Sequence, residues 1–178
     1  MMFGCETISL LQSKSQIKRL KIQRIGKSMP VEVGQKAPDF TLPSDRGDIT
    51  LSRYAGKTNV VLAFYPGDFS PLCTSEMQCF ADDWTKFREA GAEILGISTD
   101  PIEKHLAFSK KLGLQFPLLS DRNQEVCKKY GVASLFGSKR AYCIIDIQGI
   151  VRYMHIEFLP IFKREDNELL VVLRGLKA

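Results

Sequence analysis

The sequence of 178 residues is poor in the residue types and motifs that hold metals and nucleotide cofactors. It has only two histidines, His105 and His155, which lie far apart and have no metal-ligand spacing around them. It also has no glycine-rich loop of the kind that cradles phosphates. We therefore expect neither a metal ion nor an organic cofactor at the functional site.

Cysteine is also scarce, and its pattern excludes a disulfide-stapled domain. The five cysteines are Cys5, Cys73, Cys79, Cys127 and Cys143, an odd count without a C-x-x-C pair. A secreted domain held together by disulfides would be shorter and richer in cysteine. The pattern instead fits a reducing compartment with one or two working thiols, so we expect a cytoplasmic protein.

Long apolar runs are absent, and the charge is balanced over most of the chain. Runs such as residues 59–65 have the length of a strand and fall far short of the ~18 residues needed to cross a bilayer. The net charge of +5 arises in residues 1–30, which hold six basic residues and one acidic residue, whereas the rest of the chain holds 19 of each. We therefore expect neither a membrane nor a nucleic acid partner.

The basic segment of residues 1–30 is expected to lie outside the folded domain, which we place at residues 34–178. A transit-like or membrane-surface segment is one interpretation, because apolar residues are interleaved with the basic ones. Only two of its basic residues are arginines, however, and its apolar residues keep no helical period. The other interpretation is a disordered or extraneous extension ahead of a start near Met29.

From Gly34 onward, strand and helix patterns alternate along the chain. Strands are predicted at residues 39–42, 48–51, 59–65, 93–98, 116–119, 141–146 and 151–156, and helices at 71–90, 101–112, 123–130 and 165–176. The first two strands and the last two are expected to form hairpins, and Asp100 is expected to cap the helix that opens at Pro101. The order predicts an α/β domain with a mixed sheet and helices on both faces.

The segment of residues 64–76 carries the strongest chemical signal. A buried strand ends at Pro66, a loop follows, and a helix then begins at Pro71 with Cys73 in or near its first turn. A helix N-terminus carries about half a positive charge and free N–H groups, and both favour a thiolate. This setting also places Cys73 at the carboxyl end of the sheet, where open α/β folds bind their substrates.

Two polar residues, Ser70 and Glu76, lie within one helical turn of Cys73 in the sequence. Ser70 precedes it by three residues, so its hydroxyl can reach the sulfur or a bound oxygen substrate, or can simply cap the helix. Both roles are compatible. Glu76 follows one turn later and can close a capping box or hold a distant cation.

The segment resembles the peroxiredoxin family, in the branch that contains the bacterioferritin-comigratory and AhpE-like proteins. The matching residues are Pro66, Ser70 and Cys73 at the family's spacing, followed by Thr74 and Glu76, with Ser70 as an accepted variant of the usual threonine. The resemblance extends over residues 34–176, with further ordered matches at 34–42, 96–100, 116–121 and 140–146. It implies a thioredoxin-like fold with an N-terminal hairpin extension.

The resemblance also implies a role for each matching residue. Cys73 would be the peroxidatic thiolate that attacks a hydroperoxide and becomes a sulfenic acid. Ser70 would align the peroxide, and Pro66 would shield the sulfenate from water. Arg140 would favour the thiolate and stabilise charge on the leaving oxygen. The implied activity is that of an antioxidant peroxidase that uses thioredoxin or a similar thiol as reductant.

The sequence offers three candidates for the thiol that resolves the sulfenic acid. Many relatives carry a cysteine five residues after the peroxidatic one, but here Gln78 holds that position and Cys79 follows at six. Six residues of intact helix rise about 9 Å and turn about 240°, which separates the two Cα atoms by roughly 10 Å, beyond disulfide reach unless the helix unwinds. Cys127 is a second candidate and an external thiol a third, whereas Cys143 is expected in the core and Cys5 is not expected to take part.

Two other classes of function would use the same residues. A peroxide sensor or redox relay would oxidise Cys73 once without efficient turnover, and a thioredoxin-like interaction module would not need Cys73 at all. The combination of Pro66, Ser70 and Arg140 argues against the module. The short chain after Asp146 leaves little room for an exchanged C-terminal arm, so we expect a monomer or homodimer.

Overall fold

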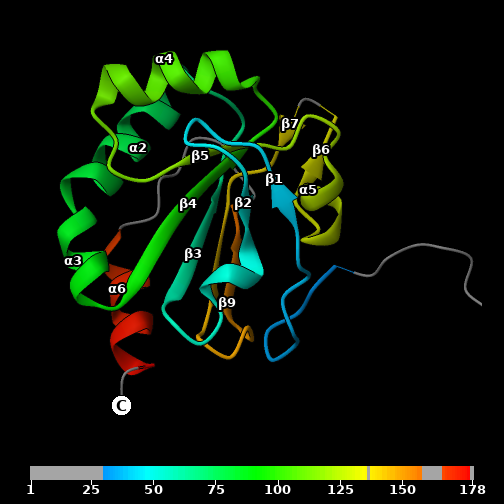
Figure 1. Cartoon of the computed structure of the whole chain (residues 1–178), viewed down its shortest axis with the longest axis vertical. Helices are drawn as coiled ribbons and strands as arrows, with labels where there is room; N and C mark the ends of the chain where they lie inside the picture. The colour runs from blue at the N-terminus through cyan, green and yellow to red at the C-terminus, as the bar shows by residue number, and fades with distance from the viewer. Residues whose placement is uncertain (1–29, 136, 158–165, 177–178) are drawn as a thin grey trace, which may run out of the picture.

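The computed structural model describes residues 30–135, 137–157 and 166–176 (Figure 1). The predictions for the N-terminal segment, including Cys5, therefore fall almost entirely outside the described residues, as does the predicted start of the last helix at Glu165.

The centre of the fold is a five-stranded mixed sheet with the strand order β5-β4-β3-β8-β9. Its strands are β3 (Asn59–Phe64), β4 (Ala92–Ser98), β5 (Leu118–Ser120), β8 (Ala141–Ile145) and β9 (Val151–Ile156). The first three run parallel to one another, whereas β8 pairs antiparallel with both β3 and β9. The mixed sheet predicted from the sequence is thus confirmed, as is the hairpin of β8 and β9.

The side chains of β3 alternate between the two faces of the sheet, as the period of two in a strand requires. Val60, Leu62 and Phe64 belong to one buried cluster, and Val61 and Ala63 belong to the other. Every residue of the strand is buried, which explains its continuous apolar run. The carboxyl end of β3 therefore enters the following loop between two packed layers.

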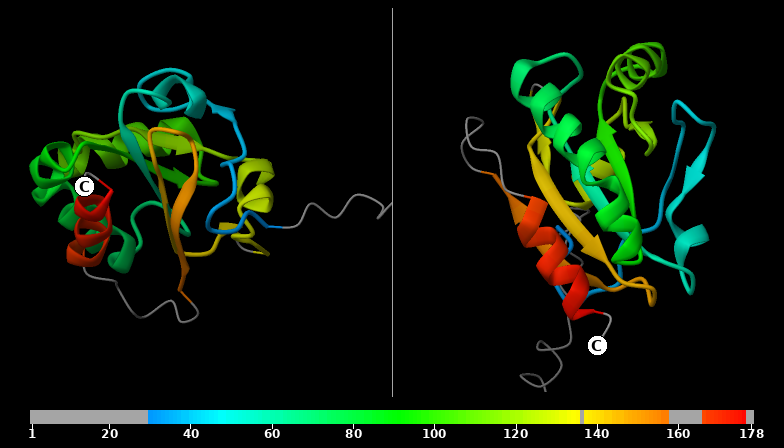
Figure 2. Two further views of the ribbon diagram at one scale, coloured as in Figure 1. Left: turned by 90° about the horizontal axis from the view of Figure 1, so that it is seen from below. Right: turned by 90° about the vertical axis from the view of Figure 1, so that its left-hand side faces the viewer.

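Helices cover both faces of this sheet, as predicted (Figures 1 and 2). The face of Val61 and Ala63 is covered by α2 (Pro71–Asp82), α3 (Trp84–Glu89), α4 (Ile102–Leu112) and α6 (Asp166–Gly175). The opposite face is covered by α5 (Glu125–Lys129), the hairpin of β1 (Thr41–Leu42) and β2 (Ile49–Thr50), and the 3-10 helix η1 (Leu51–Tyr54). The predicted N-terminal hairpin is confirmed by the pairing of β1 with β2.

The predicted helix over residues 71–90 is wrong in one respect, because it is divided at Asp83. This residue has φ −95° and ψ 3°, outside the ideal helical range, and separates α2 from α3. Its carboxylate accepts a hydrogen bond from Lys86 Nζ over 2.7 Å. Aspartate is unfavourable in a helix interior and favoured at helix ends, which agrees with the division at this position.

The predicted cap of α4 is also wrong. The N-cap is Pro101, with φ −71° and ψ 156°, and no side chain caps this helix. The Asp100 carboxylate instead accepts hydrogen bonds from Asp68 N over 2.6 Å and from Lys104 Nζ over 2.9 Å. The expected cap is therefore replaced by a contact with the loop that precedes α2.

A small hairpin of β6 (Ala133–Ser134) and β7 (Gly137–Ser138) was not predicted, because two-residue strands give no periodic signal. It lies against the end of β3. Gly137 has φ +115°, and a Cβ atom there would lie 3.1 Å from the carbonyl oxygen of Pro66. Glycine therefore permits both the backbone conformation and the close approach to the loop after β3.

Candidate active site

Cys73 lies in the first turn of α2, at the carboxyl end of β3, and is fully buried. Ser70 is the N-cap of this helix and Pro71 occupies its first position. The Ser70 Oγ accepts a hydrogen bond from Cys73 N over 3.3 Å, so the capping interpretation of Ser70 is confirmed. Because the oxygen acts as acceptor here, the hydroxyl hydrogen can be donated to another group.

Arg140 brings a guanidinium into contact with Cys73. It directly precedes β8, whose first residue, Ala141, pairs with Phe64 at the end of β3. The Arg140 Nη2 donates to Cys73 Sγ over 3.3 Å, and the side chain is only 3% exposed. The sulfur of Cys73 is thus in direct contact with a buried cation.

Glu76 and Tyr142 complete the surroundings of Arg140. The Arg140 Nη1 donates to Glu76 Oε2, and Tyr142 Oη donates to Glu76 Oε1 over 2.6 Å. The sequence allowed Glu76 to hold a distant cation, and this is confirmed. The capping box is not formed with Glu76, because the third helical position is Cys73 itself.

The charges in this site fix the protonation of its donors. Burial by itself lowers the pKa of the Arg140 guanidinium, but the charges of Glu76 and Cys73 outweigh burial and raise the pKa above its ordinary value. Burial, followed by the Glu76 carboxylate, raises the pKa of Tyr142 far above its ordinary value. Arg140 is therefore a permanent cation, and Tyr142 is a neutral hydrogen-bond donor.

Tyr142 is a site residue that sequence reasoning missed. Tyr142 lies on β8, two residues after Arg140, which directly precedes the strand. Both side chains therefore point to the same face of the sheet. Alternation along a strand could have placed Tyr142 beside Arg140. The carboxylate that joins them lies more than sixty residues earlier in the chain, and no local pattern predicts that contact.

Pro66 opens the loop that leads to Cys73, and its side chain is exposed. Its carbonyl oxygen packs against Gly137, as described above. The shielding role that the resemblance implies for Pro66 therefore stays a prediction.

The remaining described cysteines differ from Cys73 in position and in ionisation. Cys79 is half-buried on the same unbroken helix. Cys127 and Cys143 are fully buried in the cluster on the opposite face of the sheet from Cys73. Burial raises the pKa of Cys143 to about 12, and burial together with Asp121 raises the pKa of Cys127 even further. These two thiols are thus protonated at neutral pH.

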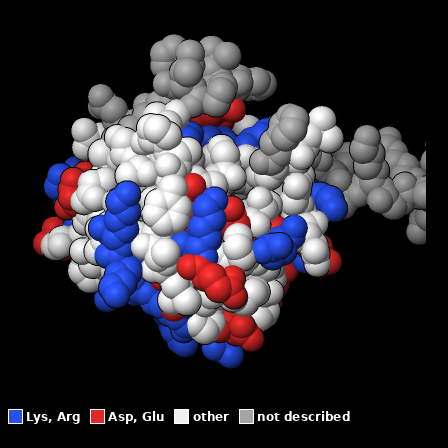
Figure 3. All heavy atoms as spheres, turned by 90° about the horizontal axis from the view of Figure 1, so that it is seen from above, with Lys and Arg blue, Asp and Glu red and all other residues white. Residues whose placement is uncertain are grey.

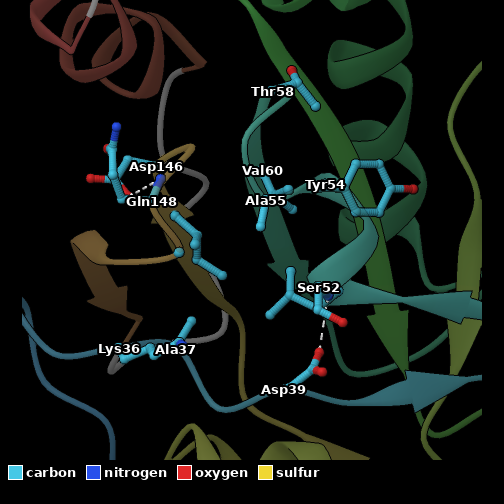
Figure 4. A pocket seen from close by; sticks show the side chains of 13 residues that line it. Lys36, Ala37, Asp39, Ser52, Tyr54, Ala55, Thr58, Val60, Asp146 and Gln148 are labelled. Carbon is cyan, nitrogen blue, oxygen red and sulfur yellow. Dashed lines mark hydrogen bonds between the residues drawn. The ribbon is translucent and has the colours of Figure 1, made fainter.

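A pocket of about 200 Å³ lies at the opposite end of β3 from Cys73 (Figure 4). Thr58 and Val60 from the start of that strand line it, together with Asp146 and Gln148 from the turn between β8 and β9. The Asp146 carboxylate accepts hydrogen bonds from the N–H of Gln148, the N–H of Ile150 and Arg152 Nε. This pocket lies away from Cys73, and its Asp146 carboxylate is already bound by residues of the same hairpin. We therefore assign it no part in the chemistry at Cys73.

The charged side chains near α4 do not form a patch of one sign. Figure 3, seen from the side on which α4 lies, shows basic and acidic side chains interspersed. The cation that contacts the Cys73 sulfur is the buried Arg140. Within the described ranges, no set of three or more His, Cys, Asp or Glu side chains is arranged to hold a metal ion.

A cysteine at a helix N-terminus, in contact with a buried guanidinium at the carboxyl end of a central strand, indicates a thiol-based redox protein. Residues 33–154 match the AhpC/TSA family. The chain is 44% identical over 132 residues to a bcp-type peroxiredoxin of Coxiella burnetii, with 69% of this chain and 87% of the relative covered. It is 41% identical over 152 residues to the chloroplastic peroxiredoxin Q of Sedum lineare, with 83% and 80% covered.

The fold comparison agrees with the sequence comparisons. The reduced 2-Cys peroxiredoxin of Plasmodium vivax superposes with a TM-score of 0.77 and 31% identity, and the match covers 83% of each chain. The chain therefore belongs to the AhpC/TSA family of peroxiredoxins, which are thiol-dependent peroxidases, and its similarity extends to the bcp and peroxiredoxin Q branch. The predicted family, thioredoxin-like fold and enzyme class are thus confirmed.

Membership of this family implies a peroxide substrate and a thiol reductant. A search of the described helices for length and apolar character finds none that could span a bilayer.

Proposed function

We propose that this peroxiredoxin reduces hydrogen peroxide and organic hydroperoxides through Cys73. The observation that carries the proposal is the 3.3 Å contact between Arg140 Nη2 and the buried sulfur of Cys73. A thiolate in this setting is stabilised by a fixed cation and by the N-terminus of α2. It attacks the terminal peroxide oxygen, the O–O bond breaks, and the sulfur becomes a sulfenic acid.

The charge that develops on the leaving oxygen needs donors in the same place. Arg140 Nε is buried and has no hydrogen-bond partner among the described residues, so its N–H is available to a peroxide oxygen. The Ser70 hydroxyl is the second donor, because its oxygen already accepts from Cys73 N. The leaving oxygen then takes a proton and departs as water or an alcohol, and Pro66 is proposed to shield the sulfenate from water.

Ser70 is expected to act through its hydroxyl. Ser70→Ala removes both the cap and the donor, so we expect the rate constant for peroxide oxidation of Cys73 to fall by about 10²-fold, the lower end of the loss for a single transition-state donor. Ser70→Thr keeps both groups and is expected to stay close to the wild-type rate. Stopped-flow oxidation kinetics measure the effect.

The loss of the cap alone costs about 1 kcal/mol of stability, which denaturant unfolding measures separately. A Ser70→Ala rate equal to that of wild type, with only the stability lowered, would leave Ser70 as a cap without a role in alignment.

We propose that an external thiol, thioredoxin or a similar reductant, returns the oxidised Cys73 to its thiol form. The other routes are less favourable in the native fold. Cys79 follows on an unbroken α2, where six residues separate two Cα atoms by roughly 10 Å. Cys127 belongs to the core cluster on the far face of the sheet, so a Cys73–Cys127 disulfide would have to cross it.

Cys79→Ser is therefore expected to leave steady-state turnover with a thioredoxin system unchanged. The substitution replaces a half-buried thiol with a hydroxyl of similar size, so the fold should tolerate it. Peroxide consumption under excess reductant measures the effect. A large loss of turnover, with Cys73 accumulating as sulfenic or sulfinic acid, would make Cys79 the resolving residue and require the first turns of α2 to unwind.

Sustained turnover is the experiment that separates the peroxidase from a peroxide sensor. With hydrogen peroxide and a recycling thiol in excess, the peroxidase consumes many equivalents of peroxide per chain. A sensor or relay is oxidised once and then stops, or passes its oxidation to a partner protein. Consumption limited to one equivalent in the presence of every reductant tested would favour the sensor.

The catalytic domain is proposed to comprise residues 34–178, with the basic segment 1–30 outside it. The family match, which begins at residue 33, supports this boundary. We also propose that it acts in the cytoplasm as a monomer or homodimer; the location rests on the cysteine pattern. The transit-like interpretation of residues 1–30 competes with this location, and imaging of the full chain fused to a C-terminal fluorescent protein distinguishes the two.

A further inference from the structure

A buried hydrogen-bond cluster ties the loop of residues 66–70 to α4. It consists of Tyr65, Asp68 and His105, and the side chains of Asp68 and His105 are completely inaccessible to solvent. Tyr65 Oη donates to Asp68 Oδ1 over 2.7 Å, and His105 Nδ1 lies 2.7 Å from Asp68 Oδ2. Both oxygens of the loop carboxylate are thus bound by side chains that lie outside the loop.

The directions of these hydrogen bonds follow from the chemistry of the groups. Burial, followed by Asp68, raises the pKa of Tyr65 well above its ordinary value, so the hydroxyl keeps its proton and donates. His105 must carry a proton on Nδ1 to donate to Asp68. Its Nε2 is buried without a hydrogen-bond partner among the described residues. The polar contacts of the ring among the described residues are therefore those of Nδ1, with Asp68 and, over 3.4 Å, with Tyr65 Oη.

A second set of contacts holds the backbone of the same loop. The Asp68 N–H donates to Asp100 Oδ2, and Lys104 Nζ on α4 donates to the same oxygen. A Cβ atom on Gly67 would lie 2.9 Å from this oxygen, so a larger residue there would displace the Asp100 carboxylate. The side chain and the backbone of Asp68 are thus fixed independently.

The loop that these contacts hold is strained. Phe69 has φ +64°, a conformation that is uncommon for an aromatic residue. Its ring packs against Phe108 of α4, with 5.0 Å between the ring centroids. Such a backbone persists only where its surroundings determine it, and the next residue is Ser70, which caps α2 at Cys73.

We propose that Tyr65, Asp68 and His105 are positioning residues for the peroxidase reaction at Cys73. They hold the strained loop in the conformation that places the cap of α2 and the catalytic sulfur. The inference rests on the proposed function, because it assigns these residues a part in the same reaction. None of the three touches the reacting sulfur in the contacts described.

Breaking the cluster has two opposite consequences for Cys73. A relaxed loop displaces Ser70 and moves the sulfur away from Arg140, which slows the reaction with peroxide. The same relaxation uncovers a thiol that is fully buried in the native fold, which speeds its reaction with a bulky aromatic disulfide reagent. A change in stability that left the loop in place would produce neither effect.

The test compares Tyr65→Phe, His105→Leu and His105→Asn with Tyr130→Phe. The asparagine amide can still donate to Asp68, whereas leucine cannot. Tyr130 Oη donates to Pro38 O over 3.0 Å on the opposite face of the sheet, so Tyr130→Phe removes one tyrosine hydrogen bond away from the loop. Stopped-flow oxidation by hydrogen peroxide, labelling of Cys73 followed by peptide mass spectrometry, and denaturant unfolding are measured for each.

We expect Tyr65→Phe and His105→Leu to slow oxidation by about tenfold or more, since a displacement of about 1 Å at a reacting centre can cost 10²-fold. Both are expected to accelerate labelling of Cys73. His105→Asn and Tyr130→Phe are expected to keep wild-type rates in both assays. Wild-type oxidation rates in Tyr65→Phe and His105→Leu, or an equal loss in Tyr130→Phe, would overturn the inference.

The two readouts also separate this inference from the proposed function. If wild-type Cys73 fails to react with hydrogen peroxide, the proposed function is wrong, but labelling still reports on the loop. Labelling of Cys73 that is equally slow in Tyr65→Phe and Tyr130→Phe would then overturn the positioning role on its own.

Discussion

Cys73→Ser is expected to abolish peroxide turnover completely. A serine hydroxyl is close in size to the thiol but is not ionised at neutral pH, and a neutral hydroxyl does not attack the O–O bond at a measurable rate. The cap from Ser70 and the surroundings of Arg140 need not change, so the fold is expected to survive. Peroxide consumption and far-ultraviolet circular dichroism, measured on the same preparation, test both parts.

The matched control for this substitution is Cys143→Ala. Cys143 is as deeply buried as Cys73, but it lies in the cluster on the opposite face of the sheet. Burial raises its pKa to about 12, so at neutral pH it is a protonated thiol. Turnover is expected to be retained in Cys143→Ala, and residual turnover in Cys73→Ser would assign the chemistry to another cysteine.

Arg140→Gln is expected to give the second-largest loss, about 10²- to 10³-fold in the rate constant for oxidation of Cys73. Glutamine keeps a donor but removes the charge that contacts Cys73 Sγ. The loss of this charge removes stabilisation from the charge that develops on the leaving oxygen. Stopped-flow oxidation kinetics measure the loss.

The control for Arg140→Gln must separate catalysis from folding. The single substitution leaves the Glu76 carboxylate, which is 1% exposed, without its cation, and breaking a buried pair costs about 3–5 kcal/mol. The double variant Arg140→Gln with Glu76→Gln removes the charge on both sides and is expected to regain much of the stability. Its oxidation rate is expected to stay low. Recovery of the rate together with the stability would show that Arg140 acts only on the fold.

Local patterns predicted most of the fold and the centre of the site. The apolar run of β3, the N-terminal position of Cys73 and the cap from Ser70 are properties of neighbouring residues, so the sequence contains them directly. Arg140 could be assigned only through the family resemblance, because nothing near it in the chain distinguishes it from a surface arginine. The structure brings it to the sulfur through the pairing of β3 with β8.

The features that sequence reasoning missed depend on contacts between distant segments. The carboxylate of Asp68 is bound by His105, 37 residues later, and Tyr142 binds Glu76, 66 residues earlier. Asp100 carries the residue type of a helix cap, but its carboxylate bonds to the loop at Asp68 instead. In each case the role of a polar side chain depends on a hydrogen-bond partner far away in the sequence. Local helix and turn propensities carry no information about such partners.

The most direct test of the assignment of Cys73 is mass spectrometry of the reduced protein after one equivalent of hydrogen peroxide, with a sulfenic acid trap present. We predict that the trap adduct forms on the peptide that contains Cys73, while Cys127 and Cys143 remain thiols. An unmodified Cys73 alongside an oxidised cysteine elsewhere in the chain would contradict the account.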